Sequence, residues 1–231
     1  MLVHLNIVHA DNIVGGLVEA ELSCGHALRR VERTDAQASM TEFEFHPLTP
    51  KRWNDFEQLF GPRGAYGGCW CMWWRLTRAE FEENQNEGNR RAMKAIVDSG
   101  QVPGILAYLD GHAVGWCSVA PRERFASLSR SPVLKPIDDQ PVWSIVCFYI
   151  DKAHQGQGVS KALIRGAQEY VARKKGRIIE AYPTVPRVAK RLPPVSSFMG
   201  IPSGFAGAGF EEVARPSRAK MIMRYRIRSS G

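Results

Sequence analysis

The 231 residues are 44% hydrophobic and 23% charged, which is the composition of an ordinary soluble globular protein rather than of a disordered, collagenous or membrane chain. At roughly 100 to 200 residues per core, the length predicts one large domain or one domain with an appendage, and argues against two full domains. The net charge of +8 leaves two kinds of partner open, an anionic small molecule and a nucleic acid.

Signals for export, disulfides and metals are weak. No stretch approaches the roughly 18 to 20 consecutive apolar residues that span a bilayer, and the amino terminus lacks the features of a secretory signal, so we expect a cytoplasmic protein with no membrane partner. The five cysteines predict free thiols rather than a disulfide framework. Cys69 and Cys71 form a C-x-C pair, but no second Cys/His pair lies at zinc-ligand spacing, so we expect no metal.

The first 39 residues differ from the rest of the chain. They show weak periodicity and hold three arginines against five acidic residues, so the excess of positive charge lies after them. From Met40 the pattern becomes regular. We therefore expect residues 1–39 to be a poorly structured N-terminal extension and residues 40–231 to form the folded domain, with Met40 as the native initiator.

The domain begins with a strand and helices. Thr41–His46 alternates apolar and polar residues, which predicts a half-buried strand. Thr49 and Pro50 predict the start of a helix that continues to Phe60. After a turn-rich loop, helical spacing predicts one helix over Thr77–Ser99.

An aromatic cluster, Cys69–Arg75, lies between those helices and is too dense in apolar side chains for an exposed loop. Its members Trp70, Trp73 and Trp74 could form a clamp with Arg75 that binds an amine or an aromatic substrate by cation–π contact. Packing in the core explains them equally well. Both alternatives stay open.

Strands dominate the second half. Gly104–Leu109 and His112–Val119 are predicted to form a hairpin across Asp110-Gly111. A polar excursion over residues 121–141 precedes Val142–Ile150, whose nearly continuous apolar run predicts a strand buried on both faces. Near the C-terminus a basic run alternates with apolar residues, which predicts a solvated strand face; it comprises Arg215, Arg218, Lys220, Arg224, Arg226 and Arg228.

A glycine-containing loop, Asp151–Lys161, lies between the strand at Val142–Ile150 and a helix. In this order, successive backbone N–H groups can converge on an anion at the helix N-terminus, where the dipole adds about 0.3–1 kcal/mol per charge. We therefore expect a phosphorylated ligand. The loop lacks the G-K-[ST] ending of a nucleotide-triphosphate loop and the G-x-G-x-x-G pattern of a dinucleotide site.

These residues resemble the GNAT superfamily of acyl-CoA-dependent N-acyltransferases. Gln155-x-x-Gly158-x-Ser160 matches the family signature [Q/R]-x-x-G-x-[G/A], with a small serine in place of glycine or alanine. Ala208–Val213 resembles the Gly-Phe that begins the family's sixth strand. Cys69–Arg75 and Ala208–Arg215 resemble the C-W-C-M-aromatic-W-R and A-G-F-x-E-V-A-R segments of an uncharacterised bacterial group in the superfamily.

The resemblance implies an α/β (α+β) fold with a mixed, mostly antiparallel sheet of about seven strands and about four flanking helices. It also implies acetyl-CoA as cosubstrate, with the pantetheine arm on the backbone of Phe148, Tyr149 and Ile150 and the thioester carbonyl at the Phe148 amide. The Gln155 side chain is either a direct ligand or a loop residue that caps the helix. The diphosphate would lie on Gln155, Gly156, Gln157, Gly158, Val159, Ser160 and Lys161.

The family's usual catalytic side chains are missing. Ser144 stands where some members carry a glutamate base, and Phe205 where some carry a tyrosine acid. Glu180, in a strand predicted over Arg177–Ala181, is the nearest substitute base. Alternatively, Glu180 forms an ion pair with Arg173, Lys174 or Lys175.

Two other side chains near the loop are weaker candidates. His154 is expected to be a solvated loop residue, because a base must reach the amine rather than the phosphates. Cys147 is expected to be an unactivated thiol that behaves as a small hydrophobe.

Functions from different classes remain. The leading hypothesis is an enzyme that moves an acetyl group from acetyl-CoA to a primary amine of a small molecule or peptide. The alternative, favoured by Ser144 and Phe205, is a catalytically degenerate acyl-CoA-binding or sensing module. A nucleic-acid partner ranks last because it rests on charge alone. The acceptor and the oligomeric state, a homodimer included, stay open.

Overall fold

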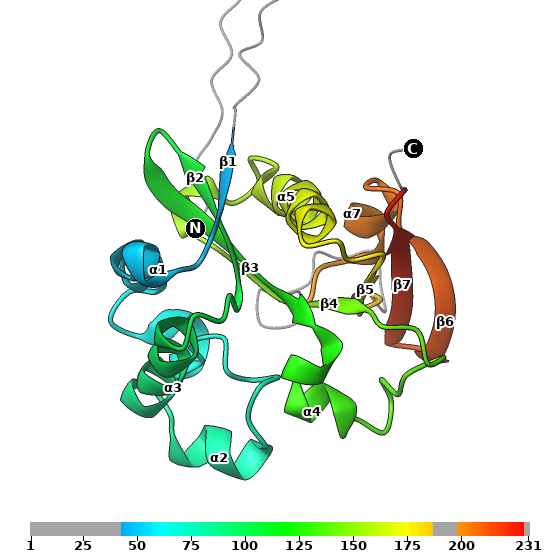
Figure 1. The fold of residues 1–231 in the computed structure, drawn as a ribbon, viewed down its shortest axis with the longest axis horizontal. Helices are drawn as coiled ribbons and strands as arrows, with labels where there is room; N and C mark the ends of the chain where they lie inside the picture. The colour runs from blue at the N-terminus through cyan, green and yellow to red at the C-terminus, as the bar shows by residue number, and fades with distance from the viewer. Residues whose placement is uncertain (1–42, 187–197, 229–231) are drawn as a thin grey trace, which may run out of the picture. The chain divides into compact units, whose positions relative to one another are not determined.

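The sheet of this computed structural model, which describes residues 43–186 and 198–228, has seven strands in the order β1-β2-β3-β4-β5-β7-β6 (Figure 1). All neighbouring pairs are antiparallel except β4 and β5. This confirms the predicted mixed, mostly antiparallel sheet. The expected extension over residues 1–39 lies outside the described residues. The strands are β1 (Glu44–Pro47), β2 (Gly104–Leu109), β3 (His112–Pro121), β4 (Trp143–Ile150), β5 (Ile178–Ala181), β6 (Glu211–Ser217) and β7 (Lys220–Arg226).

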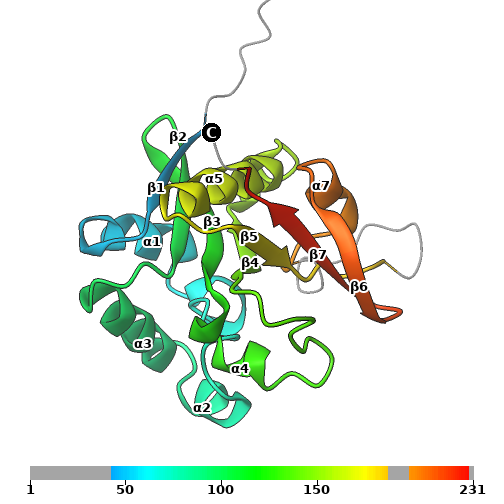
Figure 2. The same ribbon diagram turned by 45° about the vertical axis from the view of Figure 1, so that its right-hand side comes forward.

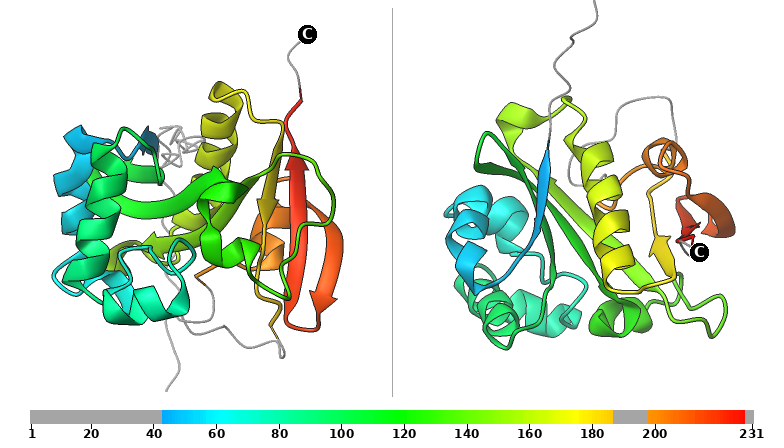
Figure 3. Two further views of the ribbon diagram at one scale, coloured as in Figure 1. Left: turned by 60° about the horizontal axis from the view of Figure 1, so that its bottom comes forward. Right: turned by 45° about the horizontal axis from the view of Figure 1, so that its top comes forward.

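Helices pack on both faces of the sheet (Figures 2 and 3). Within the described ranges, three helices are longer, α1 (Trp53–Phe60), α3 (Glu87–Asp98) and α5 (Val159–Arg173), and three are short, α2 (Arg78–Glu83), α4 (Ala126–Ser129) and α7 (Pro202–Ala206). None of these helices combines the length and the apolar character that crossing a bilayer requires. Single helical turns lie at Pro50–Arg52, Arg122–Arg124 and Lys152–His154. Gly64–Gly68 forms a turn whose inner residues have non-helical backbone angles.

Each face of the sheet has its own apolar core. The α5 face buries Leu163, Ala167 and Val171 against β2, β3 and β4. The opposite face buries Phe56 of α1 and Met93 of α3 with Trp116 of β3. Burial of this apolar surface is the main favourable term in folding, so the sheet holds α5 and α1 at fixed positions on opposite faces.

The prediction of one helix over Thr77–Ser99 is wrong, because the chain forms α2 and α3 with a break between them. Thr77 begins α2 through a capping box with Glu80, as its sequence allows. Asn86, in the break, adopts a φ of 60°, and its N–H donates to Gly68 O at 3.2 Å. The Asn89 side chain donates to the same oxygen at 3.0 Å. A tertiary contact with the preceding loop therefore overrides helical propensity here.

The predicted hairpin is confirmed, and β4 adds a bulge that sequence periodicity did not show. Asp110 and Gly111 join β2 and β3 with φ values of 49° and 77°, as a tight primed turn requires. In the β3–β4 pairing, Ser118 faces Cys147 and Val119 faces Ile145, which leaves Val146 as the extra residue of a bulge. Bulges bend and twist a strand, so β4 changes direction at Val146.

The basic run near the C-terminus does not form a wholly solvated face. Arg224 of β7 is only 5% exposed and forms ion pairs with Asp138 and Glu180. The prediction is therefore wrong for Arg224. Alternation along a strand places every second residue on one face, but it does not reveal that one of these residues pairs with a buried carboxylate, that of Glu180.

Gly115 of β3 allows the first turn of α5 to pack closely on the sheet. A Cβ at Gly115 would lie 2.8 Å from Val159 Cγ1 and 3.1 Å from Leu163 Cδ1. Gly115→Ala should lower the free energy of unfolding by about 1–3 kcal/mol, because overpacking forces neighbours to shift, and should weaken CoA binding because α5 carries the predicted loop. Chemical denaturation and calorimetric titration measure the two effects.

Gly104→Ala is the matched control. Its Cβ would meet Cys117 O at 2.2 Å, away from α5, so it should destabilise the fold without a separate loss of CoA affinity. Equal CoA affinities for both variants would contradict the link between Gly115 and the loop.

Candidate functional site

The loop after β4 leaves backbone N–H groups unpaired at the start of α5. Gly156 and Gly158 have φ values of 84° and 83°, a region that glycine adopts without strain. The first hydrogen bond of α5 runs from Ala162 N–H to Gly158 O at 3.1 Å. The N–H groups of Val159, Ser160 and Lys161 therefore have no acceptor within the helix. This is the arrangement that binds an anion at a helix N-terminus.

Side chains of the loop hold its own backbone in place. Gln155 Nε2 donates to Ile150 O at 3.3 Å, and Gln157 Nε2 donates to Ala153 O at 2.9 Å. Asp151 Oδ2 accepts from Ala153 N–H and lies 2.8 Å from His154 Nδ1. Gln155 thus bonds the loop's own backbone, and whether its side chain is also a direct ligand stays a prediction; His154 bonds a loop carboxylate.

The loop is open to solvent and basic. Residues 155–158 are exposed, as are Lys152, Ser160 and Lys161. A Cβ added at Gly156 or Gly158 would meet no atom within 4 Å. Unpaired amides, a helix N-terminus and two nearby ammonium groups fit a diphosphate, and no neighbouring side chain covers the turn.

Beyond the bulge, the edge of β4 that faces β5 is no longer paired with β5. β4 and β5 pair only from Trp143↔Ile179 to Ile145↔Ala181. Beyond this point, the Phe148 N–H donates to Phe198 O at 2.6 Å, and the Thr184 N–H donates to Gly200 O at 3.1 Å. The segment Phe198–Gly200 thus bridges the diverging strands, and the amide predicted to bind a thioester carbonyl binds a carbonyl of the chain itself.

A buried charged cluster lies where β4 and β5 are paired. Glu180 is 1% exposed. Its Oε1 accepts from Arg122 Nη1 at 3.1 Å and from the Tyr182 hydroxyl at 2.7 Å, and its Oε2 accepts from Arg224 Nε at 2.7 Å. The expected ion pair exists, but its partners are Arg122 and Arg224 instead of Arg173, Lys174 or Lys175.

Ser144 joins this cluster through Tyr182. Ser144 is fully buried, and its Oγ lies 2.8 Å from the Tyr182 hydroxyl. Burial is the main cause that raises the pKa of Tyr182 far above its usual range, followed by the Glu180 charge. The cluster therefore connects Ser144, Tyr182 and Glu180 by hydrogen bonds. Ser144 and Glu180 face each other in the β4–β5 register, a pairing that the sequence alone did not reveal.

Arg122, Tyr182 and Arg224 were missed in the sequence. Tyr182 lies two residues after Glu180, and this spacing places both side chains on one face of an extended segment, so a signal existed for it. Arg122 comes from the excursion after β3, and its Nη2 also donates to Leu134 O at 2.5 Å. Nothing in the local pattern marks such long-range partners.

Phe205 offers no proton donor, as expected from its side chain. It is fully buried in α7. Its ring centroid lies 6.0 Å from that of Phe148 and 5.1 Å from that of Phe210. At the position where some family members carry a tyrosine, this chain has an apolar contact.

The Cys69–Arg75 segment mostly belongs to the core. Trp70 is 5% exposed and stacks on Phe60 with centroids 5.7 Å apart, so it packs in the core. Trp73 is exposed beside Phe81. The Arg75 guanidinium lies over the Phe125 ring, 4.5 Å from the centroid, and not against a tryptophan.

The cysteines near β4 are not activated. The Cys71 thiol and burial raise the pKa of Cys147 well above its ordinary value. Burial raises the pKa of Cys117 well above it too, and the pKa of Cys69 to about 12. These thiols are protonated at neutral pH, and the thiolate is the nucleophilic form. Within the described ranges, no group of three or more Cys, His, Asp or Glu side chains is placed to hold a metal ion.

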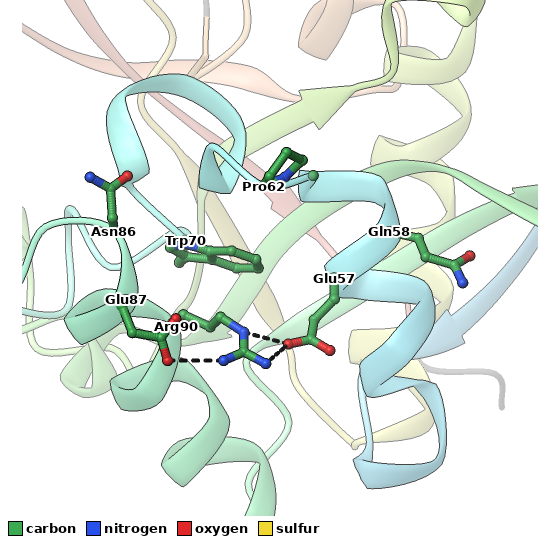
Figure 4. Close-up of a pocket in the computed structure, with 8 residues that line it drawn as sticks. Glu57, Gln58, Pro62, Trp70, Asn86, Glu87 and Arg90 are labelled. Carbon is green, nitrogen blue, oxygen red and sulfur yellow. Dashed lines mark hydrogen bonds and ion pairs between the residues drawn. The ribbon is translucent and has the colours of Figure 1, made fainter.

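A separate open pocket of about 600 Å³ lies between α1 and α3 (Figure 4). Arg90 points between two carboxylates there, bonding Glu57 and donating from Nη1 to Glu87 Oε1 at 2.9 Å. The pocket shares no residue with the loop at Asp151–Lys161. Its lining residues are Glu57, Gln58, Gly61, Pro62, Trp70, Asn86, Glu87 and Arg90.

Comparison with known proteins decides the family. A model of the Acetyltransferase (GNAT) family matches residues 70–190, which include β2 to β5, the loop and α5. The chain belongs to the GNAT acetyltransferase family. It is therefore an acyltransferase, and acyl transfer from a CoA thioester is its general chemistry. The likeness to one bacterial group within the family stays a prediction.

One solved structure agrees on the fold, and others are similar to a lesser degree. A GNAT-family acetyltransferase from Listeria monocytogenes 4b F2365 superimposes with a TM-score of 0.50 at 12% identity, over 83% of this chain and 98% of the other. The PaiA N-acetyltransferase from Thermoplasma acidophilum, solved in complex with coenzyme A, gives a TM-score of 0.45 at 13% identity, over 80% and 99%. No curated protein matches the sequence.

Gly158→Glu tests the loop. The carboxylate would stand where a diphosphate is predicted to bind, and like charges repel, so CoA affinity should fall by at least about tenfold, equivalent to ~1.4 kcal/mol. Calorimetric titration with CoA measures it. A glutamate at the left-handed φ of position 158 also adds about 1–2 kcal/mol of backbone strain, which lowers the stability of the variant.

Gly100→Glu carries the matched strain, since Gly100 also has an open environment, with a φ of 80°, at the end of α3. It should bind CoA like the unchanged protein. Retained affinity in Gly158→Glu, or equal losses in both variants, would count against the loop.

Glu180→Gln tests the charged cluster. Loss of the carboxylate leaves Arg122 and Arg224 without their shared buried anion, so the free energy of unfolding should fall by about 3–5 kcal/mol. Denaturant unfolding measures it. Glu169→Gln, whose partner Arg173 lies 3.9 Å away on the surface of α5, should lose no more than about 1 kcal/mol. Similar losses in both variants would show that the buried cluster contributes no more to the free energy of unfolding than a surface ion pair does.

Proposed function

We propose that the protein is an N-acetyltransferase that moves the acetyl group of acetyl-CoA directly to a primary amine of a small molecule or peptide. One observation carries this proposal. The unpaired amides at the start of α5 follow β4, in which the Phe148 N–H lies beyond the last residue pair with β5 and bonds Phe198 O. Diphosphate and thioester sites would then lie along one continuous stretch, from Phe148 to Lys161.

Phe148 would supply the electrostatic part of catalysis. Its N–H already binds a carbonyl oxygen, that of Phe198, at 2.6 Å, so it is oriented for such an acceptor. A thioester carbonyl that replaced Phe198 O would have this donor aimed at the oxyanion that develops during transfer. One such donor contributes roughly 10²- to 10³-fold in rate.

The proton released by the acceptor amine would pass along Ser144, Tyr182 and Glu180. The hydrogen bonds Ser144–Tyr182 and Tyr182–Glu180 provide a route from the family's base position to a carboxylate. Glu180 is our proposed acceptor of the amine proton. The proton would reach it through the Ser144–Tyr182–Glu180 hydrogen bonds, because the Glu180 oxygens also bond Arg122 and Arg224. A base that acts through relaying hydroxyl groups needs an unbroken line of hydrogen bonds to the reacting amine.

A second candidate, an acyl-CoA-binding module without transferase activity, is favoured by one feature of the site. The positions that hold a glutamate and a tyrosine in some relatives carry Ser144 and Phe205, and both are fully buried. Such a module would bind the donor through the same loop.

Thiol release separates the two candidates. Acetyl-CoA is first titrated into the protein by calorimetry, and the thiol is then monitored with a colorimetric disulfide reagent over a panel of amino acids, polyamines, aminoglycosides and peptides. Binding followed by amine-dependent release is the expected result. Binding without release from any amine would favour the sensing module, and absence of binding would overturn both. Gly158→Glu should abolish release, whereas Gly100→Glu should retain it.

A further inference from the structure

Lys220, the first residue of β7, has an unusual environment for a lysine. Its Nζ donates to Thr184 Oγ1 at 3.1 Å and lies 3.3 Å from Met199 Sδ. Among the ion pairs of residues 43–186 and 198–228, none includes Lys220. Burial lowers its pKa. The side chain is therefore a half-buried amine with no carboxylate to stabilise its charge.

The Lys220 amine lies beside the segment Phe198–Gly200, which bonds β4 through the Phe148 N–H. Met199, which it contacts, is 1% exposed and follows directly on Phe198, whose carbonyl accepts from the Phe148 N–H. Thr184, its other partner, bonds Gly200 of the same segment. Met199 packs with Val146 of β4 and Ile222 of β7 in one apolar cluster. Lys220 therefore contacts the residue that follows Phe198, whose carbonyl Phe148 binds.

We propose that Lys220 is an internal acyl acceptor, so that the protein acetylates itself at this residue. The inference rests on the proposed function, because the acetyl carbonyl must replace the Phe198 carbonyl at the Phe148 N–H. In this proposal the Phe198–Gly200 segment moves aside, the contact between Met199 and Lys220 is lost, and the Lys220 amine becomes free to reach the acetyl carbonyl.

The reaction needs no reagent besides acetyl-CoA. The neutral Lys220 Nζ attacks the thioester carbon, a C–N bond forms, and the C–S bond breaks. The CoA thiolate leaves with the electron pair of that bond and is protonated, while the nitrogen loses a proton to solvent. Because a buried amine with no anionic partner sheds its proton more readily than an exposed lysine, a larger share of Lys220 is in the reactive form at neutral pH.

Peptide mapping by mass spectrometry tests the proposal. The full chain is incubated with acetyl-CoA, and acetylation of Lys220 is compared with that of Lys51, an exposed lysine distant in sequence from the site. Lys220 should be modified at least about tenfold faster than Lys51, which corresponds to a barrier lower by ~1.4 kcal/mol. Equal or slower modification of Lys220 would overturn the inference.

Two controls separate site-directed transfer from ordinary chemical reactivity. Acetyl phosphate, which lacks the CoA moiety, should not reproduce the preference for Lys220, and Gly158→Glu should lose the preference with acetyl-CoA. If either condition still favours Lys220, its reactivity alone explains the modification and the proposal fails. Lys220→Arg should remove the mapped peptide modification and leave that of Lys51 unchanged.

The same samples distinguish this failure from failure of the proposed function. Calorimetry reports acetyl-CoA binding, and the thiol assay reports release to added amines. Binding and amine-dependent release without modification of Lys220 would reject the internal acceptor alone. If acetyl-CoA does not bind, the proposed function fails first and the internal acceptor fails with it.

Discussion

The short parallel pairing between β4 and β5 is the constraint on which the site depends. The two strands pair over three residue pairs, from Trp143↔Ile179 to Ile145↔Ala181, and the bulge at Val146 then turns β4 away. A continuous ladder would have consumed the Phe148 N–H. Because the ladder stops, a backbone donor with fixed direction is left at an internal edge of the sheet, where apolar cores on both faces hold it in place.

The buried cluster around Glu180 fixes this junction at the end where the strands still pair. Arg122 and Asp138 come from the excursion between β3 and β4, Glu180 from β5 and Arg224 from β7. Three separate parts of the chain therefore meet at these charges, and Glu180 and Arg224 are each 5% exposed or less. Buried ion pairs add little net stability over apolar packing, yet losing one partner is severe. Such a cluster specifies one arrangement of strands. It also holds the Glu180 carboxylate behind Tyr182, whose hydroxyl donates to it, so that Glu180 does not contact the Phe148 N–H directly.

Features encoded by local pattern were predictable, and features decided by distant partners were not. The Asp110-Gly111 hairpin, the apolar strand β4 and the loop with Gly156 and Gly158 depend on neighbouring residues, and the structure contains all three. The break between α2 and α3 depends on Gly68, which lies far from Asn86 in sequence. The partners of Glu180 and the burial of Arg224 likewise come from other strands. The contact between Phe198 and Phe148 crosses 50 positions of the printed sequence, and no periodicity could reveal it.

The Phe198 carbonyl also bears on the order in which ligands come and go. If the proposed site is correct, an acylated donor would offer an oxygen in place of Phe198 O at the Phe148 N–H, and the exchange would replace one hydrogen bond by another. The deacylated thiol has no such oxygen, and the chain's own carbonyl can then reclaim the donor, which avoids an unpaired buried N–H. Discrimination between substrate and spent product would thus be built into the backbone, and turnover would be favoured by expulsion of free coenzyme A.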